Sequence, residues 1–196
     1  KNTHGKITPF TPNAQSDAGL FMVSAGAIIE NQSTGNILLL KRAASQNQAG
    51  EWELARGRLE NGETVEEGLR REVAEETGIS DLTIIKPLTT QLVATSSSKL
   101  ENEIVVITFI CQTSQVEAAV SAEHDEARWV EPSEALKLVK MKGVRLAIET
   151  YIGWKNEVRA TQQLQDRAAR AVADYQNLVR RNTDDRARFI KLATTI

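Results

Sequence analysis

A helix whose start and end are both specified by nearby residues is the most restrictive feature of this chain. Thr64 and Glu67 form a capping box, in which each side chain bonds the backbone N–H group of the other residue. Gly78 supplies the left-handed residue that commonly ends a helix. We therefore predict a helix over residues 65–77. Its packed face is marked by apolar residues four positions apart, at Val65, Leu69 and Val73.

The same helix carries a cluster of carboxylates. Glu72, Glu75 and Glu76 lie at positions i, i+3 and i+4, so their side chains share one side of the helix. This acidic stripe overlaps the edge of the apolar stripe, and we expect the three acids to be partly buried. Clustered, partly buried carboxylates repel one another unless they are protonated or bind a cation. An oxygen-only site favours Mg²⁺ or Mn²⁺, although a solvated acidic face is the simpler interpretation of three glutamates taken alone.

Short apolar runs on both sides of this helix predict a sheet. The strongest is Ile104–Cys111, where almost every residue favours a strand and the continuous apolar character indicates burial on both faces. Val23–Glu30 and Asn36–Lys41 suggest a hairpin, and Ser133–Val139 suggests a second helix with Pro132 in its first turn. Weaker strand candidates are Leu82–Ile85, Gln91–Thr95 and Arg128–Val130. Strands around two separate helices indicate a mixed α/β or α+β sandwich.

The wider spacing around the acidic helix resembles the signature of the Nudix hydrolase family. Gly57 is followed after five residues by Glu63 and, after seven more, by Arg-Glu-Val-Ala-Glu-Glu-Thr-Gly-Ile over residues 71–79. Four flanking segments resemble the core strands of the family and the lead into its signature: Ser24–Ile29, Leu38–Arg42, Trp52–Leu54 and Trp129–Val130. The resemblance covers about residues 20–152. It implies a Nudix-type α/β/α sandwich with a mixed sheet, here followed by a long C-terminal helix.

The resemblance also implies a reaction and roles for individual residues. The reaction is attack by water on a phosphorus atom of a nucleoside diphosphate linked to another group, assisted by Mg²⁺ or Mn²⁺. Glu72, Glu75 and Glu76 would be the principal metal ligands, together with the backbone carbonyl of Gly57. Glu72 is also a candidate general base. The residues assigned to the structure of the signature are Glu63 and Arg71, as a charge pair, and Gly78.

One departure from the family pattern lies just before the signature. The family usually has Pro-Gly or Pro-Lys at this point, whereas this chain has Ala55-Arg56. Losing the proline loosens a loop that should be stiff, but Arg56 adds a cation, and arginine binds phosphate well. We therefore take Arg56, with Arg42, as candidate substrate-binding residues.

A further carboxylate is a candidate for catalysis. Glu123 lies six residues before Trp129, where some members of the family, MutT among them, place an acid on a loop. Glu123 would act as the general base or as an extra metal ligand, with Glu72 as the alternative base. An ordinary acid in the charged loop over residues 123–126 is the other interpretation.

The character of the chain changes near residue 154. Residues 155–196 contain no glycine and no proline, and they carry nine basic against five acidic residues, a balance of +4. The first 154 residues have a balance of −6. We predict three parts, namely an extended lead-in over residues 1–19, a Nudix domain over residues 20–154 and a helical extension over residues 155–196.

The extension has the four-three spacing of a coiled coil from Leu164 to Ile196, with polar residues at two seam positions, Asn182 and Asp185. About residues 160–196 resemble the N-terminal coiled-coil helix of GrpE, the nucleotide exchange factor of DnaK chaperones. The seam predicts a homodimer through these residues, in which Asn182 defines the register and each domain keeps its own active site. A single helix that docks back on its own domain is the alternative.

Composition disfavours several other classes of protein. The net charge of −2 and the aromatic content of 5% argue against a nucleic-acid-binding surface. One cysteine, Cys111, cannot form an internal disulfide and is expected in the core, and two histidines leave no Cys/His zinc cluster. Since no run approaches the roughly 18 apolar residues of a membrane helix and no signal segment opens the chain, we expect a cytoplasmic protein.

These observations favour a pyrophosphohydrolase whose partners are a nucleotide-type substrate and a divalent ion. The alternatives are a catalytically silent Nudix module that binds a nucleotide or a protein, and a dimeric, chaperone-associated protein like GrpE. The complete set of acids favours the enzyme, because a silent module would not need every acid. ADP-ribose, oxidised guanine nucleotides, dinucleoside polyphosphates and nucleotide sugars are all open as substrates.

Overall fold

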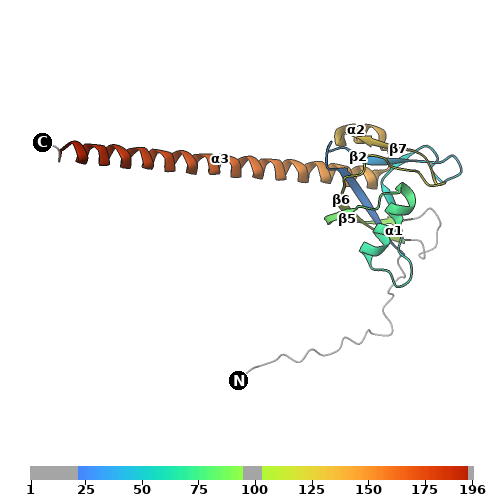
Figure 1. Cartoon of the computed structure of the whole chain (residues 1–196). Coiled ribbons are helices and arrows are strands. Elements are labelled where there is room, and N and C mark those ends of the chain that lie inside the picture. Colours follow the sequence, from blue (N-terminus) through green and yellow to red (C-terminus); the bar gives the residue numbers. More distant parts are fainter. Residues whose placement is uncertain (1–21, 95–102, 194–196) are drawn as a thin grey trace, which may run out of the picture.

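The computed structural model describes residues 22–94 and 103–193, in which a mixed sheet lies between helices (Figure 1). The predicted lead-in over residues 1–19 lies outside the described residues. In chain order the elements are β1 (Met22–Asn31), β2 (Ile37–Arg42), β3 (Trp52–Glu53), β4 (Ala55–Arg58), α1 (Val65–Thr77), β5 (Thr83–Ala94), β6 (Glu103–Thr113), β7 (His124–Val130), α2 (Pro132–Leu138) and α3 (Lys142–Ala193).

The seven strands form a single sheet whose continuous path runs in the order β3-β2-β1-β6-β5. Beside this path, β4 pairs with β1, and β7 pairs with β2. The central pair, β1 and β6, is parallel from Met22–Ile104 to Asn31–Thr113, while the other pairings of the described strands are antiparallel. The predicted mixed sheet is therefore confirmed.

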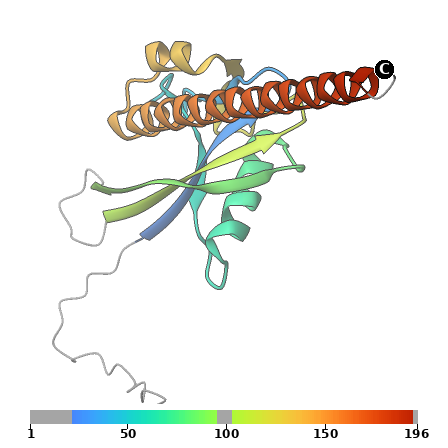
Figure 2. The same ribbon diagram turned by 90° about the vertical axis from the view of Figure 1, so that its left-hand side faces the viewer.

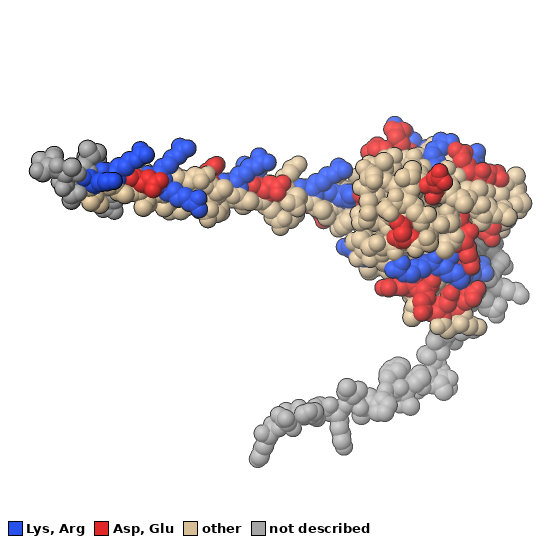
Figure 3. All heavy atoms as spheres, viewed as in Figure 1, with Lys and Arg blue, Asp and Glu red and all other residues tan. Residues whose placement is uncertain are grey.

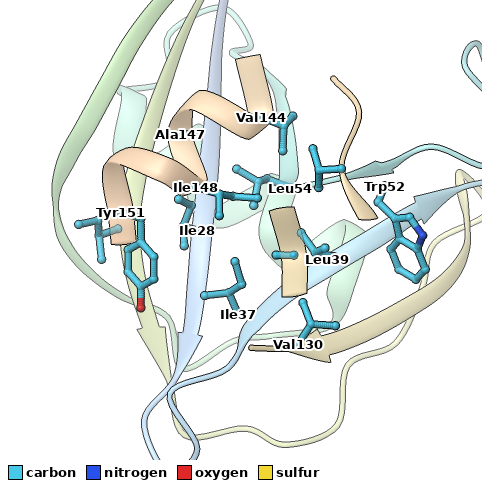
Figure 4. Packing of buried hydrophobic residues seen from close by; sticks show 13 residues of the cluster. Ile28, Ile37, Leu39, Trp52, Leu54, Val130, Val144, Ala147, Ile148 and Tyr151 are labelled. Carbon is cyan, nitrogen blue, oxygen red and sulfur yellow. The ribbon is translucent and has the colours of Figure 1, made fainter. Parts of the chain in front are cut away.

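Helices cover both faces of the sheet (Figures 1 and 2). On one face, α1 packs against a cluster that includes Ala25, Ala27 and Ile29 of β1. On the other face, α2 and the first turns of α3 pack against a cluster that includes Ile28, the intervening residue of the same strand (Figure 4). Because side chains alternate across a strand, a strand covered on both faces is apolar where it crosses the core, as β1 is from Ala25 to Ile29. The predicted three-layer sandwich is confirmed.

Helix α1 begins and ends where its sequence predicts. The hydroxyl of Thr64 accepts the N–H of Glu67, and the carboxylate of Glu67 accepts the N–H of Thr64 at 2.8 Å. Gly78 has a φ of +69°, and its N–H bonds the carbonyl of Ala74. Leu69 and Val73 are fully buried. The capping box and the glycine end of this helix are thus both present.

Strand β5 differs from the sequence prediction. Two short strands, Leu82–Ile85 and Gln91–Thr95, were expected, whereas Thr83–Ala94 form one long strand paired with β6. Thr95 lies outside the described residues. The pairing register shifts on both sides of Lys86-Pro87, so that irregular pairing accommodates Pro87, which has no N–H to donate. Pro87 interrupts the apolar strand pattern in the sequence, but it does not end the strand.

Helix α3 is anchored to the sheet by a buried polar group. The carboxylate of Glu30, 4% exposed at the end of β1, accepts the hydroxyl of Tyr151 at 2.7 Å and the ammonium of Lys155 at 2.7 Å. Tyr151 also fills the apolar cluster beneath the helix together with Ile148 (Figure 4). A buried carboxylate with two such partners is well satisfied, so these contacts fix the direction in which α3 leaves the domain.

The predicted boundary near residue 154 falls inside α3, which is one continuous helix of 52 residues. Up to Lys155 the helix packs on the sheet, and from Asn156 onward every described side chain is exposed. The helix therefore projects away from the domain (Figure 1), and none of the described side chains beyond Asn156 is buried by docking back. The change in composition marks the end of packing and not the end of a secondary-structure element.

No helix in the described ranges combines the length and the apolar character that crossing a membrane requires.

Candidate metal and active site

Helix α1 packs against β4, and Glu72 occupies the space beside Gly57. A Cβ atom at Gly57 would lie 1.8 Å from the Cδ atom of the Glu72 carboxyl group. The carbonyl of Gly57 accepts the hydroxyl of Ser24 at 2.7 Å, and a carbonyl oxygen has a second lone pair. The missing side chain of Gly57 is therefore what allows the carboxylate to rest against the backbone of β4.

Glu76 is the most buried acid of this helix, at 9% exposed. Its Oε2 atom accepts the backbone N–H of Arg56 at 3.0 Å. Burial raises the pKa of Glu76 to about 7, against the opposing effects of His124 and of the Arg56 hydrogen bond. A bound cation would relieve this cost, because it stabilises the charged form of a buried carboxylate.

Arg71 joins the remaining acids of the signature. It donates to both carboxylate oxygens of Glu63, at 2.7 and 3.0 Å, and to the carbonyl of Arg58 at 3.0 Å. Its Nη1 atom also contacts Glu72 at 2.9 Å and Glu75 at 3.2 Å. The hydrogen bonds from Arg71 contribute most to lowering the pKa of Glu63 to about 2. Arg71 thus ties the loop before the helix to the helix itself and partly neutralises two of the acids.

A second charged group lies beside Glu76 and was not predicted as part of the site. Glu53 of β3 is 2% exposed, and its Oε1 atom accepts hydrogen bonds from Arg42 at 2.5 Å and from Nε2 of His124 at 3.3 Å. The Nε atom of Arg56 lies 3.4 Å from Oε2 of Glu53, which is buried without a hydrogen-bond partner among the described residues. Burial alone would raise the pKa of Glu53, but the bond from His124 and the charges of Arg56 and Arg42 outweigh it, so the pKa is lowered.

The loop that carries Glu123 is attached to the C-terminal end of α1. The N–H of Ser121 donates to the carbonyl of Glu76 at 3.2 Å, and the N–H of Ala119 donates to the carbonyl of Thr77 at 2.9 Å. The carbonyl of Glu123 accepts the N–H of Ala43 at 2.8 Å. The backbone of this loop is thus held beside the acids of α1, while the side chain of Glu123 is exposed.

The donor atoms of these residues suit a divalent cation. In residues 22–94 and 103–193, no three Asp, Glu, His or Cys side chains converge as a preformed metal cluster, because Glu72 and Glu75 are turned toward Arg71. The chemistry of the donors nevertheless fits a hard ion. Glu72 rests in a space that only a glycine leaves, Glu76 has a raised pKa, and Oε2 of Glu53 is buried and unpartnered. Oxygen donors of this kind suit Mg²⁺.

A pocket of about 320 Å³ lies on the face of β4 opposite the glutamates. The side chain of Arg56 lines it, whereas the neighbouring Gly57 faces α1. We call this the Arg56 pocket. Its other lining residues come from the sheet, from the loop after β2, and from the segment that leads into α3, and they are Gly26, Gln48, Leu54, Gln91, Val93, Val106, Thr108, Met141, Lys142, Gly143 and Val144. Arg56 therefore connects the pocket to Glu53 through its side chain and to Glu76 through its backbone.

Arg42 occupies a different position from Arg56. Its guanidinium bonds both Glu53 and, at 2.6 Å, the carbonyl of Asn47. These bonds hold the carboxylate of Glu53 in place, and the role of Arg42 in substrate binding stays a prediction. Sequence reasoning missed Glu53 and His124 as parts of the site. The one signal for this pair is that Glu53 stands between the apolar residues Trp52 and Leu54, where a buried charge is expected.

Replacing Gly57 by alanine is expected to weaken Mg²⁺ or Mn²⁺ binding about tenfold or more. The added Cβ displaces the carboxyl group of Glu72, and disturbing the support of a ligand typically costs ~10–100-fold in metal affinity. The free energy of unfolding should change little, because the displaced group is the end of a flexible side chain. Titration calorimetry with Mn²⁺ measures the effect. Gly153→Ala is the matched control, since nothing lies within 4 Å of an added Cβ at Gly153. Unchanged affinity in Gly57→Ala would remove Glu72 from the metal site.

Comparison with known proteins gives one family. The family model described as NUDIX domain matches residues 20–149. Nucleoside triphosphatase NudI from Escherichia coli O17:K52:H18 (strain UMN026 / ExPEC) is 30% identical over 130 residues, which cover 58% of this chain and 92% of that protein.

Solved structures agree with this match. The crystal structure of MutT protein from Methanosarcina mazei Go1 has 27% sequence identity and a TM-score of 0.59, and the likeness covers 70% of this chain and 97% of that one. An Ap4A hydrolase from C. elegans has 20% identity and a TM-score of 0.60, over 69% of this chain and 98% of the other, and at this identity it supports the fold alone.

Proposed function

The chain belongs to the Nudix family of hydrolases, and from this premise we propose that it catalyses magnesium-dependent hydrolysis of the pyrophosphate bond in a nucleoside diphosphate linked to another moiety. One observation carries most of the weight. A glycine in β4 accommodates the carboxylate of Glu72, while Glu76, four residues further along the helix, is buried against the backbone of Arg56. This arrangement brings together acids that repel one another and that a cation would stabilise.

Glu72, Glu75, Glu76 and the carbonyl of Gly57 would hold the metal. When bound, Mg²⁺ supplies charge for the phosphate oxygens and lowers the pKa of water. Glu75 is 60% exposed in its side chain and reaches only Arg71 among its described ion pairs, so it can turn without breaking a buried contact. Mn²⁺ has the same preference for oxygen donors.

The Arg56 pocket would take the part of the substrate beyond the phosphates. Arg56 would bind a phosphate there, because Arg56 lines the pocket and its backbone N–H bonds Glu76. The other walls are mainly apolar, with the amide of Gln91 held to the carbonyl of Gly143 at 2.9 Å. Such a pocket, apolar with a few fixed polar groups, is typical of small-molecule sites.

The general base is proposed to be Glu123 or Glu72. Glu72 contacts Arg71 at 2.9 Å, so its carboxylate is already engaged in an ion pair. The side chain of Glu123 is exposed on a loop whose backbone is fixed to the end of α1. A loop acid of this kind is free to approach a water molecule beside the metal.

The relatives widen the choice of substrate. The printed names include a nucleoside triphosphatase, an Ap4A hydrolase and a dihydroneopterin triphosphate pyrophosphohydrolase. We therefore add nucleoside triphosphates to ADP-ribose, oxidised guanine nucleotides, dinucleoside polyphosphates and nucleotide sugars. We also place the protein in the cytoplasm, where such compounds and Mg²⁺ are available.

A phosphate- and pyrophosphate-release panel over these compounds, with and without Mg²⁺, tests the function. We expect turnover of at least one compound that is abolished by chelation and restored by Mg²⁺. Glu76→Gln serves as the inactive control, so that contaminating phosphatases are recognised. Nucleotide binding without turnover of any compound would support the silent-module alternative and overturn the hydrolase.

The GrpE-like character of residues about 160–196 stays a prediction. The family match ends at residue 149 and does not test it. The exposed helix beyond Asn156 does favour a role in association, and the form of that association is a separate question.

A further inference from the structure

The projecting part of α3 exposes large apolar side chains to solvent. Between Asn156 and Ala193, the exposed ones include Leu164, Val172, Tyr175, Leu178 and Val179, each 44–68% exposed. Figure 3 shows charged atoms along the upper edge of this helix and mostly uncharged ones along its lower edge. Isolated helices are stabilised mainly by packing an apolar face, so this face is expected to be covered by another molecule.

The apolar face has the geometry of a coiled-coil seam with one apolar flank. In heptad notation the seam positions a and d are held, in the part with described side chains, by Leu164, Ala168, Ala171, Tyr175, Leu178 and Asn182. The e positions with described side chains are Val158, Gln165, Val172 and Val179, and the g positions are Ala160, Arg167, Asp174, Arg181 and Arg188. One flank is therefore largely apolar and the other is mostly charged.

These unequal flanks distinguish the two possible directions of a partner helix. In a parallel pair, g positions face e positions, which would put Asp174 beside the partner's Val179 and Arg167 beside the partner's Val172. In an antiparallel pair, e faces e and g faces g. Val172 then meets the partner's Val179, and Asp174 meets the partner's Arg181. The antiparallel direction matches apolar Val172 with Val179 and pairs Asp174 with Arg181 near the centre of the helix, while Arg167 faces the partner's Arg188 nearer its ends.

The charge of the whole chain favours the same direction. The domain side, up to residue 154, has a balance of −6, and residues 155–196 have a balance of +4. Antiparallel helices keep the two acidic domains at opposite ends and bring the basic end of each helix toward the partner's domain. Parallel helices would place like charges side by side at both ends.

We propose that two copies of this chain associate through α3 as an antiparallel two-stranded coiled coil, with Tyr175 of one copy level with the partner's Leu178. In this register Ala171 is level with the partner's Asn182, and the Asp174–Arg181 and Val172–Val179 contacts each form twice. The two hydrolase domains lie at opposite ends, each with a complete set of site residues. The pairing uses none of the metal or pocket residues, so it stands independently of the proposed reaction.

A charge swap in the full chain tests the direction. Asp174→Arg and Arg181→Asp should each weaken the dimer, by about tenfold in dissociation constant, since two surface ion pairs become repulsive. The double variant Asp174→Arg/Arg181→Asp should restore it, as measured by analytical ultracentrifugation. Arg170→Asp is the matched control, because position c lies away from the seam. Failure of the double variant to restore affinity would overturn the antiparallel register.

Cysteine cross-linking tests the register directly. Disulfides need Cα atoms within about 7 Å, whereas two copies of residue 171 would be ~16 Å apart along an antiparallel pair. Ala171→Cys and Asn182→Cys should therefore not cross-link alone but should do so when mixed, with a size tag on one. Self-linking of each variant would show parallel helices, and a monomeric native chain in light scattering would refute the dimer. The native chain controls for Cys111, which is fully buried.

Discussion

Replacing Glu76 by glutamine is expected to lower turnover at least about 100-fold under saturating Mg²⁺. The substitution keeps the size of the side chain and its contact with the N–H of Arg56, but it removes a negative charge from the metal site. Loss of even ~3 kcal/mol of transition-state stabilisation corresponds to about 100-fold in rate. Steady-state assays on whichever compound the release panel identifies provide the measurement.

Without metal, the same substitution should raise the stability of the folded chain. Burial raises the pKa of Glu76 to about 7 in the folded state, from an ordinary value of 4.5. A raised pKa means that stability is greatest below pH 4.5 and is lost as the pH rises through 7, because the folded state then holds an unfavourable buried charge. Glu76→Gln cannot ionise, so it should be more stable than the native chain at pH 8, by at most about 3 kcal/mol.

Urea denaturation in chelator at pH 5 and pH 8 separates these effects. The stability difference between Glu76→Gln and the native chain should grow with pH and shrink when Mg²⁺ is added. Glu75→Gln is the matched control, because the Glu75 side chain is 60% exposed and its removal should leave stability nearly unchanged. A Glu76→Gln protein with near-normal magnesium-dependent turnover would exclude Glu76 as a ligand.

The parts of the fold that could be predicted are those specified by local signals. Helix α1 is bounded by Thr64, Glu67 and Gly78, and these interactions span no more than four residues. Strand β6 could be recognised because it lies inside the sheet, between β1 and β5, and is largely apolar on both faces. Strand β5 was divided in the prediction because its continuity depends on pairing with β6 around Pro87, a contact that no local pattern encodes.

The full length of α3 also could not be predicted from the sequence. The sequence beyond residue 154 lacks glycine and proline, and that absence suggested a boundary. A helix does not need to stop where its environment changes, and the single glycine at Gly153 costs a helix only about 1 kcal/mol relative to alanine. The anchoring group of Glu30, Tyr151 and Lys155 joins residues more than 120 positions apart, which only the folded chain reveals.

The candidate site was predicted best where it is contiguous in sequence. The predicted charge pair of Glu63 and Arg71, which the structure forms, lies within one short segment. Glu53 and His124 come from strands 71 positions apart and meet only because β3 and β7 both pair with β2. His124 is 5% exposed, although a loop residue was expected. The bonds of Arg42 to Glu53 and Asn47 were not predicted, because they join residues from different segments, and its role as a substrate ligand stays a prediction.

Replacing Glu123 by glutamine distinguishes the two candidate bases. If Glu123 accepts the proton from the attacking water, kcat should fall by about 10²–10⁴-fold while KM changes little, because the loss appears only in the transition state. The side chain of Glu123 is exposed, so stability should be unaffected. Glu126→Gln, in the same charged segment, is the matched control and should retain activity.

A full pH–rate profile adds a readout that a merely structural role would not change. With Glu123 as the base, the acidic limb of the kcat profile should disappear in Glu123→Gln, because the group whose deprotonation it reports is gone. An unchanged kcat and an unchanged acidic limb would instead move the role to Glu72. Glu72→Gln could not decide the question alone, since Glu72 also rests against Gly57 and Arg71, and its loss would disturb the metal site and the base together.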